Sequence, residues 1–179
     1  MTNHSPKSTT PDATMKMSHQ GRARLRATEQ AVYRYYNDMG KDKGHCTWGV
    51  GILDHKGVCT KEEMGEKVSV EMVDREFDKK IAETERIVHR NIHVVLTQAQ
   101  FDALCSLSYN AGAKGSFTTF NLVNKDEFAG AAANIALMIK VQVVVDGKKK
   151  YVIAPGLIKR RAEEGAPFLV KDTSTAASK

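Results

Sequence analysis

The sequence predicts an α+β fold that is mainly helical, with a small β-lobe and one long connecting helix. Residues 33–59 contain three tyrosines, which favour extended backbone, together with clusters of Asn, Asp and Gly that favour tight turns. Residues 69–91 carry apolar side chains at helical spacing, and a helix of about 22 residues is roughly 33 Å long. The helical pattern returns beyond residue 97, so we expect the β-rich segment to form a minor lobe.

The elements of the first half follow from their end signals. We expect a first helix over residues 18–29, and a short helical turn over residues 61–64 that Thr60 caps. The long helix is expected over residues 69–91. Its apolar stripe consists of Val73, Phe77, Ile81, Thr84 and Val88.

Four further elements are expected in the second half. They are a helix capped by Thr97 and ended by residues 109–112, an Ala-rich helix over 128–140, a β-hairpin over 141–153, and a final helix over 155–164. The hairpin turn falls at Asp146 and Gly147, with three lysines beside it. The hairpin is expected either to rim a groove or to contact another protein.

Length and composition predict one ordinary soluble domain. The chain has 179 residues, of which 41% are hydrophobic and 27% charged, enough to build a sizeable core. The expected boundaries are a flexible tail over residues 1–17, a single domain over residues 18–170, and a second tail over residues 171–179.

Glu29 and Asp38 lie nine residues apart and are a candidate acid and base. On one continuous helix this step turns through about 900°, which leaves the two side chains on opposite faces. On one extended strand they would lie roughly 30 Å apart, whereas glycosidase carboxyl pairs lie about 5–9.5 Å apart. A helix end followed by a strand and a turn can bring both carboxyl groups to one cleft.

Thr47 heads the segment Thr47-Trp48-Gly49-Val50-Gly51 and supplies a hydroxyl that can orient a water molecule. The two glycines favour a tight β-turn, and the segment lacks the third glycine of a dinucleotide-binding loop. An acid, a base and such a hydroxyl together suggest glycoside hydrolysis.

This arrangement resembles the catalytic signature of the phage-type lysozymes, glycoside hydrolase family 24: a Glu, then an Asp or Cys, then a Thr heading Thr-x-Gly-x-Gly. Four further blocks resemble the same family in the same order. They are residues 96–104 (LTQAQFDAL), 108–112 (SYNAG), 130–132 (GAA) and 155–161 (PGLIKRR). Together the blocks span about residues 22–168. The resemblance implies a lysozyme-like fold, with the β-lobe beside an active-site cleft.

The largest departure from the family pattern is the spacing between Asp38 and Thr47. It is three residues longer than usual, with residues 41–46 (KDKGHC) intervening. Asp42 is therefore a rival for the second carboxylate. We prefer Asp38, because its distance from Glu29 along the chain matches the family.

Two other positions also depart from the pattern. Gln30 replaces the Gly that usually follows the acid. Ile52 stands where many members place a His after the second Gly, so a buried His–carboxylate pair is not expected there.

The resemblance implies a muramidase that cleaves the β-1,4 bond between N-acetylmuramic acid and N-acetylglucosamine. Glu29 would stay protonated in a partly desolvated cleft and donate its proton to the glycosidic oxygen. Asp38 would remain ionised and, with Thr47, hold the attacking water. The family analogy favours inversion at the sugar carbon.

Three residues are expected to bind substrate by the same resemblance: Leu53, Tyr109 and Asn110. Each has an alternative structural role, because Leu53 can pack on a strand, Tyr109 can be buried, and Asn110 can cap a helix. No cofactor and no metal are expected.

The formal charge of +6 and the pI near 9.2 fit attraction to an anionic surface such as a bacterial wall, a membrane leaflet or nucleic acid. The clusters at residues 148–150 and 159–161 are interpreted as solvated turns or helix faces. No nucleic-acid-binding motif accompanies them, and the apolar runs are shorter than the roughly 18 residues of a membrane span. The expected partner is bacterial peptidoglycan, bound by a monomer, without nucleic acid and without stable membrane insertion.

The polar N-terminus shows no secretory signal peptide. We therefore expect the protein to be made in the bacterial cytoplasm and to act on the periplasmic or external cell wall after release or secretion. Whether it is a phage endolysin or a toxin against competitors stays open.

The three cysteines and two of the histidines have structural interpretations. Cys105 is expected to be buried as a small hydrophobe. Cys46 and Cys59 can approach each other, with a reduced state before release as the default. His89 and His93 lack the intervening Glu of a metalloprotease, so they are interpreted as the basic end of a helix.

Two alternative functions remain. A noncatalytic wall-binding or interaction module on a lysozyme-like scaffold is motivated by the enlarged loop before Thr47. Binding to peptidoglycan without product would identify it. A basic nucleic-acid-binding protein is the third interpretation, and salt-sensitive affinity for DNA would identify it.

Overall fold

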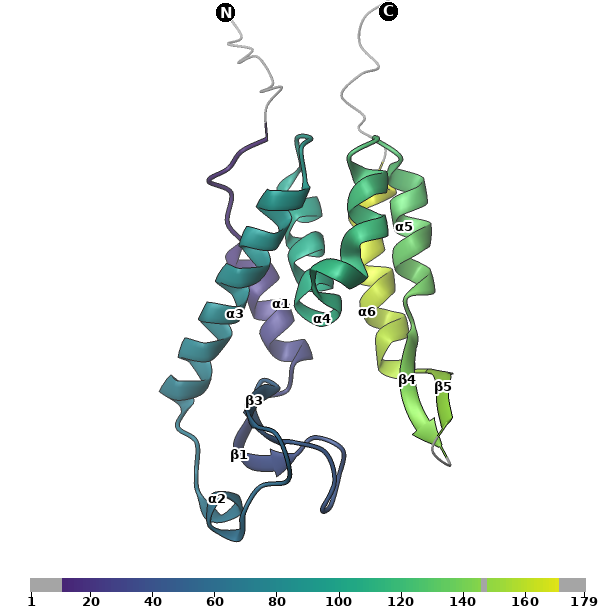
Figure 1. Ribbon diagram of the computed structural model, residues 1–179. Helices are drawn as coiled ribbons and strands as arrows, with labels where there is room; N and C mark the ends of the chain where they lie inside the picture. Colours follow the sequence, from purple (N-terminus) through teal and green to yellow (C-terminus); the bar gives the residue numbers. More distant parts are fainter. Residues whose placement is uncertain (1–10, 146–147, 171–179) are drawn as a thin grey trace, which may run out of the picture. The chain divides into compact units, whose positions relative to one another are not determined.

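The computed structural model describes residues 11–145 and 148–170, and these residues form two compact units (Figure 1). One unit comprises residues 18–83. The other combines residues 11–17 with the described residues from 84 onward. The boundary lies within the long helix α3, which contributes residues to both units. Helices predominate and the sheets are small and antiparallel, which confirms the predicted α+β class.

The unit of residues 18–83 contains the β-lobe. Its elements are α1 (His19–Thr28), β1 (Val32–Asn37), β2 (Cys46–Gly49), β3 (Ile52–His55), α2 (Lys61–Gly65) and the first part of α3 (Val70–Asn91). The three strands form an antiparallel sheet in the order β1-β2-β3. The central strand β2 is buried along its whole length, so it is the core of the lobe.

Local signals explain where these elements begin and turn. The Ser18 hydroxyl accepts a backbone N–H of the first turn of α1 (2.9 Å), and Thr60 and Glu63 form a reciprocal capping box on α2. Gly49 and Gly51 have φ values of +62° and +78°, which favour glycine, and they make the tight turn between β2 and β3. The predicted apolar stripe of α3 is confirmed, since all five of its residues are buried.

The other unit is a helical bundle with one hairpin. Its elements are the last part of α3, α4 (Gln98–Val123), α5 (Phe128–Leu137), β4 (Lys140–Val145), β5 (Lys148–Ile153), α6 (Pro155–Gly165) and a 3₁₀ turn (Ala166–Phe168). Helices α4, α5 and α6 pack against one another, and the β4–β5 hairpin extends beyond them where the chain passes from α5 to α6 (Figure 1). The predicted hairpin is confirmed, with Lys148–Ile153 in a strand, while its turn at 146–147 lies outside the described residues.

Helix α4 is longer than predicted. The capping box of Thr97 and Gln100 is confirmed at its start. The expected end at residues 109–112 is wrong, because Gly112 (φ +68°) only kinks the chain and helical structure resumes to Val123. Glycine tolerates this left-handed backbone without a side-chain clash, so the kink takes one residue.

The segment before α1 makes specific contacts. The Met17 N–H donates to Glu85 Oε1 (2.9 Å), and Lys16 forms an ion pair with the same carboxylate (3.1 Å). The His89 ring nitrogen Nε2 donates to the Met15 carbonyl (2.8 Å). The predicted tail of residues 1–17 therefore has an end, residues 15–17, that is held by the helical unit. Residues 1–10 and 171–179 lie outside the described residues.

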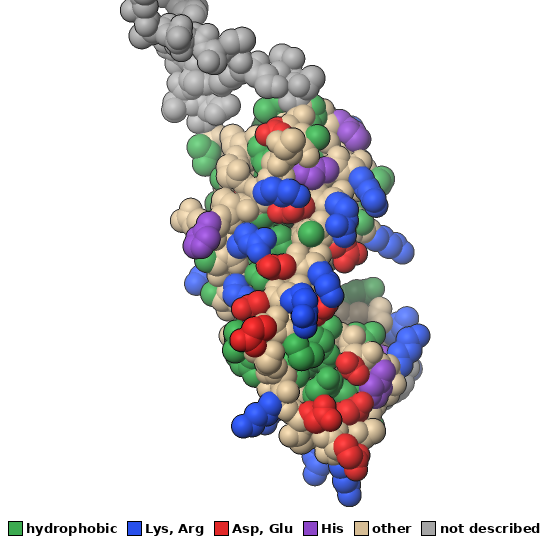
Figure 2. Space-filling model, turned by 90° about the vertical axis from the view of Figure 1, so that its left-hand side faces the viewer, with side chains coloured by type: hydrophobic (Ala, Val, Ile, Leu, Met, Phe, Trp, Pro, Cys, Tyr) green, Lys and Arg blue, Asp and Glu red, His purple; other side chains and the backbone are tan. Residues whose placement is uncertain are grey.

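Figure 2 shows one face of the molecule, on which basic and acidic side chains are interspersed rather than separated by sign. Ion pairs of α1 and α3, such as Arg26 with Asp74 (2.7 Å), follow this pattern. Within the described residues, no helix combines the length and the apolar character that crossing a bilayer requires.

Candidate active site

Glu29 lies at the C-terminal end of α1, immediately before the chain turns into β1. Its N–H donates to the Leu25 carbonyl (3.0 Å), and its side chain is half-buried. Gln30 follows with φ +41°, a left-handed backbone that costs a non-glycine residue about 1–2 kcal/mol. This conformation explains why a glycine suits the position after the acid, and the reversal at Gln30 separates the helix from the strand.

Asp38 and Thr47 are both held by the backbone of one residue, His45, through its N–H and its C=O. The Asp38 carboxylate accepts the His45 N–H through Oδ1 (2.8 Å), and the Asp38 N–H donates to the His45 carbonyl (3.1 Å). The Thr47 hydroxyl donates to the same carbonyl (3.2 Å). The backbone of His45 thus fixes a carboxylate and a hydroxyl beside each other at the start of β2.

Gly44 allows this close approach. It has φ +85°, and a Cβ atom added there would overlap Asp38 Oδ1 and lie 2.8 Å from the Met39 backbone nitrogen. Only a glycine fits both the backbone angle and the space. The enlarged loop before Thr47 therefore ends in a residue without a side chain because the Asp38 carboxylate occupies that volume.

Thr47 sits in a row of three side chains across the sheet. Its Cα is paired with Tyr36 on β1 and with Leu53 on β3, so the three side chains emerge on the same face. Leu53 is 52% exposed and Tyr36 is half-buried, whereas Thr47 is 4% exposed. The predicted water-orienting hydroxyl is therefore flanked by an exposed apolar side chain and a phenol.

The pKa of Tyr36 is affected by both candidate carboxylates. Burial, followed by the negative charges of Asp38 and Glu29, raises the pKa of the Tyr36 phenol. Tyr36, which was expected only to favour a strand, therefore lies in the electrostatic environment of Asp38 and Glu29, and it is paired across the sheet with Thr47.

Asp42, the rival second carboxylate, is placed differently. It is exposed in the loop between β1 and β2, with φ +56°. Among the described residues, no hydrogen bond or ion pair joins it to Thr47 or His45. The geometry thus connects Asp38, and not Asp42, to Thr47.

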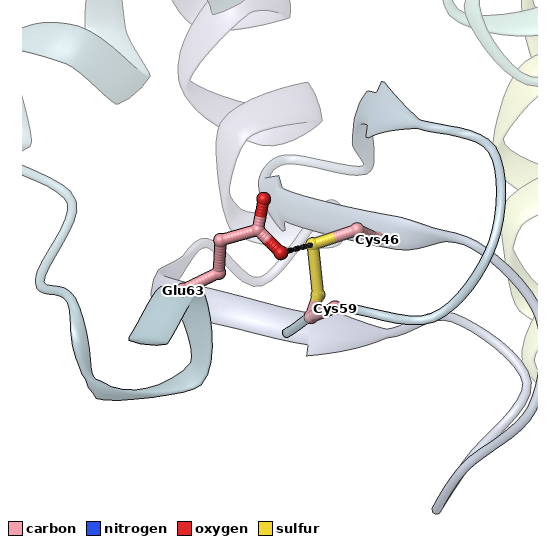
Figure 3. Close-up of side chains that lie close together, drawn as sticks. All are labelled: Cys46, Cys59 and Glu63. Carbon is pink, nitrogen blue, oxygen red and sulfur yellow. Dashed lines mark hydrogen bonds between the residues drawn. A yellow bond between two sulfur atoms is a disulfide. The ribbon is translucent and has the colours of Figure 1, made fainter. Parts of the chain in front are cut away.

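Cys46 and Cys59 form a disulfide with a Cα–Cα distance of 4.6 Å (Figure 3). The default expectation of a reduced pair is not what the structure shows. The bridge joins the first residue of β2 to the segment before α2. Glu63 Oε2 lies 3.8 Å from Cys46 Sγ, a contact rather than a donated hydrogen bond because a disulfide sulfur carries no hydrogen. The bond therefore anchors the residue next to Thr47.

His55 and Glu63 form an ion pair beside this disulfide (3.0 Å). The Lys56 carbonyl and the Glu63 carboxylate raise the pKa of His55, while the Thr60 backbone and His55 lower the pKa of Glu63. With Asp54 these two side chains lie close enough together to hold a cation, but their partners are already protein groups. The second such cluster consists of Glu63 and the two cysteines, whose sulfurs are bonded to each other.

In the helical unit, Asn110 is exposed at the kink of α4 and Tyr109 is buried. The Asn110 side-chain oxygen accepts a hydrogen bond from the Arg161 guanidinium. That contact uses the side-chain oxygen of Asn110 at an exposed position of the helix. Tyr109 is 6% exposed and packs in the core, so it offers little surface for binding.

The interpretation of residues 159–161 as a solvated cluster is wrong for two of its three members. Lys159 is exposed, but Arg160 and Arg161 are buried and share Glu164 through ion pairs of 3.0 and 2.5 Å. Their remaining donors reach the carbonyls of Ser106 and Met138, each at 3.0 Å. The spacing of an acid three and four residues after two arginines is the signal that predicts such pairing.

Cys105 is buried as predicted, and burial raises the pKa of its thiol. This environment keeps the thiol protonated and unreactive. His89 packs against Phe101, with ring centroids 5.1 Å apart, while His93 lies beyond the end of α3. His89, in the last turn of α3, thus fits the interpretation as the basic end of a helix, whereas His93 lies outside that helix.

Comparisons with known proteins agree with this architecture. The family model for phage lysozyme matches residues 26–164. An endolysin of Acyrthosiphon pisum secondary endosymbiont phage 1 is 36% identical over 108 residues, which are 59% of this chain and 70% of the endolysin.

Solved structures show the same fold. The endolysin from Escherichia coli O157:H7 phage FAHEc1 has a TM-score of 0.70 and 29% identity, over 87% of this chain and 94% of that chain. A P22 lysozyme mutant has a TM-score of 0.63 and 26% identity, over 88% and 100%. The muramidase domain of SpmX from Asticaccaulis excentricus, 24% identical over 87% and 99%, shares the fold with a TM-score of 0.67. Because the family model covers most of the sequence, the chain belongs to the phage lysozyme family and is a lysozyme-type glycoside hydrolase.

Proposed function

We propose that the chain hydrolyses the β-1,4 bond between N-acetylmuramic acid and N-acetylglucosamine of peptidoglycan, with Glu29 as the acid. Membership of the phage lysozyme family supports a peptidoglycan hydrolase. The observation that supports the residue assignment is the backbone of His45, whose N–H binds Asp38 and whose C=O binds Thr47. The two carboxylates around Tyr36 give the acid and the base of such a reaction.

Glu29 donates its proton to the glycosidic oxygen as the bond to the anomeric carbon breaks. Its place at the end of α1 fixes its backbone, and its half-buried side chain limits the water around the carboxyl group. The leaving sugar departs as a neutral alcohol, which removes the cost of expelling an alkoxide.

Asp38 and Thr47 hold the attacking water through two acceptors. The hydroxyl hydrogen of Thr47 is used on the His45 carbonyl, so its oxygen offers lone pairs. Asp38 uses Oδ1 for the His45 N–H, and Oδ2 remains for water. A water that donates one hydrogen to each directs its own lone pair at the anomeric carbon. Attack from this side inverts the carbon, and Asp38 takes the released proton.

Substrate contacts are assigned to the exposed side chains among the predicted residues. Leu53 offers an apolar surface in the same cross-strand row as Thr47, and Asn110 offers amide donors. Buried Tyr109 supports α4 from within. The site of action is the cell wall, reached after release, as the related endolysin suggests.

The test is the Glu29→Gln variant on permeabilised Gram-negative cells, read by turbidity and by mass analysis of the soluble fragments. We expect turnover to fall by about 10²- to 10⁴-fold, because the amide cannot supply the proton. Glu83→Gln, an exposed position on α3, is the matched control and should keep full activity. The wild-type products should carry a reducing end rather than an anhydro ring.

Unchanged turnover by Glu29→Gln would remove Glu29 from the acid role. Binding of the wild-type chain to sacculi without any soluble product would instead support a noncatalytic wall-binding module. Circular dichroism of each variant separates either result from loss of the fold.

A further inference from the structure

The side chain of His45 has a partner of its own, although the chemistry derived above uses only the His45 backbone. Its ring nitrogen Nδ1 accepts the backbone N–H of Gly57 at 3.1 Å. Because Nδ1 is the acceptor, the neutral ring carries its hydrogen on Nε2. His45 therefore uses its N–H, its C=O and its ring in separate hydrogen bonds.

The segment that contains Gly57 is itself fixed to the strands β1 and β2. The Gly57 carbonyl accepts the Cys46 N–H (2.8 Å), and the Cys59 N–H donates to Asn37 Oδ1 (2.8 Å). Cys59 is also bonded to Cys46 through the disulfide. The Gly57 N–H is therefore a donor whose position is set by the sheet.

The loop before His45 lacks such contacts. Residues 39–44 belong to the connection between β1 and β2, and the backbone hydrogen bonds there are local: the Gly40 N–H donates to the Asn37 carbonyl, and the Lys43 N–H to the Gly40 carbonyl. Within the part of the chain that the structure describes, no side chain of residues 39–44 forms a hydrogen bond or an ion pair. The ring of His45 is thus the side chain that ties the end of this loop to another segment.

We propose that the His45 side chain is a positioning residue: its ring, held by the Gly57 N–H, fixes the backbone that places the candidate base and hydroxyl. The inference rests on the proposed function, since it assigns to His45 a role toward Asp38 and Thr47 in that reaction. Groups that hold an attacking water act only while their geometry is kept, and a misplacement of about 1 Å can cost about 100-fold in rate. No proton transfer to or from the substrate is assigned to the ring.

The ring contact is sensitive to pH. Nδ1 accepts the Gly57 N–H only while it is unprotonated, because an imidazolium has two donors and no acceptor. The charged and titratable groups of the elements about this contact come from the loop, from β3 and the segment after it, and from α2: Asp38, Asp42, Lys43, His55, Lys56 and Glu63. Protonation of the His45 ring would break its bond to Gly57 and release the backbone of the loop end.

The test compares two substitutions of His45. In His45→Asn the side-chain oxygen takes about the place of Nδ1 and is an acceptor that does not titrate, whereas His45→Ala has no acceptor. On soluble peptidoglycan fragments, kcat of His45→Ala should fall about tenfold or more while KM changes less than about twofold, because the exposed substrate contacts remain. His45→Asn should keep kcat within about threefold of the wild type. His19→Asn, exposed on α1 of the same unit, is the control and should change neither constant.

The pH profile separates positioning by the ring from a purely structural role. On acidification the wild type should lose kcat relative to His45→Asn, since only the wild-type ring takes up a proton at this position. Titration of Glu29 and Asp38 is common to both proteins and cancels in the ratio. A ratio that stays constant over the pH range in which NMR shows the His45 ring to titrate would overturn the inference.

Amide hydrogen exchange tests the positioning without turnover. The N–H groups of residue 45 and Gly57 should be protected in the wild type and in His45→Asn, and both should exchange about tenfold faster or more in His45→Ala. Equal losses of kcat in the two variants, or full protection at residue 45 in a folded His45→Ala, would refute the role of the ring.

Circular dichroism shows whether each variant is folded. If His45→Ala does not fold, the pH-dependent ratio of the wild type to His45→Asn still decides. A wild type that cleaves no peptidoglycan would contradict the proposed function alone, because exchange at residue 45 and Gly57 still reports on the ring.

Discussion

The two units hold their candidate site residues by different means. In residues 18–83, Asp38 and Thr47 are bound by the backbone of His45, with Gly44 leaving space for the carboxylate. In the helical unit, the side chain of Asn110 is held by Arg161, which is itself buried. A loop site is therefore sensitive to added side-chain volume and to backbone restraint, whereas a helix-borne site is sensitive to the balance of buried charge.

The largest effect is expected from Glu164→Gln in the helical unit. Removing this carboxylate takes away the counter-charge that the buried Arg160 and Arg161 share, and the free energy of unfolding should fall by about 3–5 kcal/mol. Urea denaturation measures it. Glu163→Gln is the matched control, because Glu163 pairs with the exposed Lys159 at 3.7 Å, and the substitution should cost less than about 1 kcal/mol. Equal losses in the two variants would mean that burial of the Glu164 ion pairs does not increase their contribution to the free energy of unfolding.

The next effect concerns the disulfide of the β-lobe. It closes a loop of 13 residues in sequence separation, which corresponds to about 3 kcal/mol of stabilisation. A reductant should therefore lower the melting temperature of the wild-type chain and reduce turnover, since Cys46 adjoins Thr47. The double variant Cys46→Ser, Cys59→Ser should have a lower melting temperature than the wild type, and the reductant should not change it. A wild-type melting temperature that does not respond would argue against the bridge.

Gly44→Ala tests the loop site directly. The new methyl group overlaps Asp38 Oδ1, so we expect turnover to fall about 100-fold, equivalent to about 2.7 kcal/mol. Gly40→Ala is a close control: its φ of +93° imposes similar backbone strain, but no atom lies within 4 Å of its added Cβ. Both variants should lose similar stability, and only Gly44→Ala should lose turnover. A comparable loss of turnover in both would show that strain, not the carboxylate, is responsible.

The smallest effect is the pH dependence of the His55–Glu63 pair. The lowered pKa of Glu63 gives stability that is present above its ordinary value of 4.5 and is lost on acidification. The raised pKa of His55 gives stability that is present below its ordinary value of 6.5 and is lost as pH rises through the raised value. The stability difference between wild type and His55→Gln should therefore peak between about pH 4.5 and 6.5. Melting curves across this range measure it, with His93→Gln as a control that should show no such peak.

The candidate acid, base and hydroxyl were predicted from residue types, spacing and the family resemblance, and the structure binds two of them, Asp38 and Thr47, to the backbone of His45. The sequence did not reveal what holds them. His45 binds Asp38 and Thr47 through its backbone N–H and C=O, which any residue except proline has, so its side chain gives no signal of these two contacts. Gly44 was visible as a glycine in an enlarged loop, but its reason, the volume of Asp38, depends on how the loop closes.

By itself the sequence determined the caps, the helix stripes and the hairpin, because a Ser or Thr beside a free N–H and an apolar repeat act over a few neighbouring residues. Only the tertiary structure decided the burial of Arg160 and Arg161, the formation of the Cys46–Cys59 bond, and the continuation of α4 past Gly112. Those outcomes depend on contacts between segments far apart in the chain. Pairing with Glu164 overrides the tendency of the charged residues 159–161 to remain in water. Packing of α4 likewise overrides the tendency of Gly112 to end a helix.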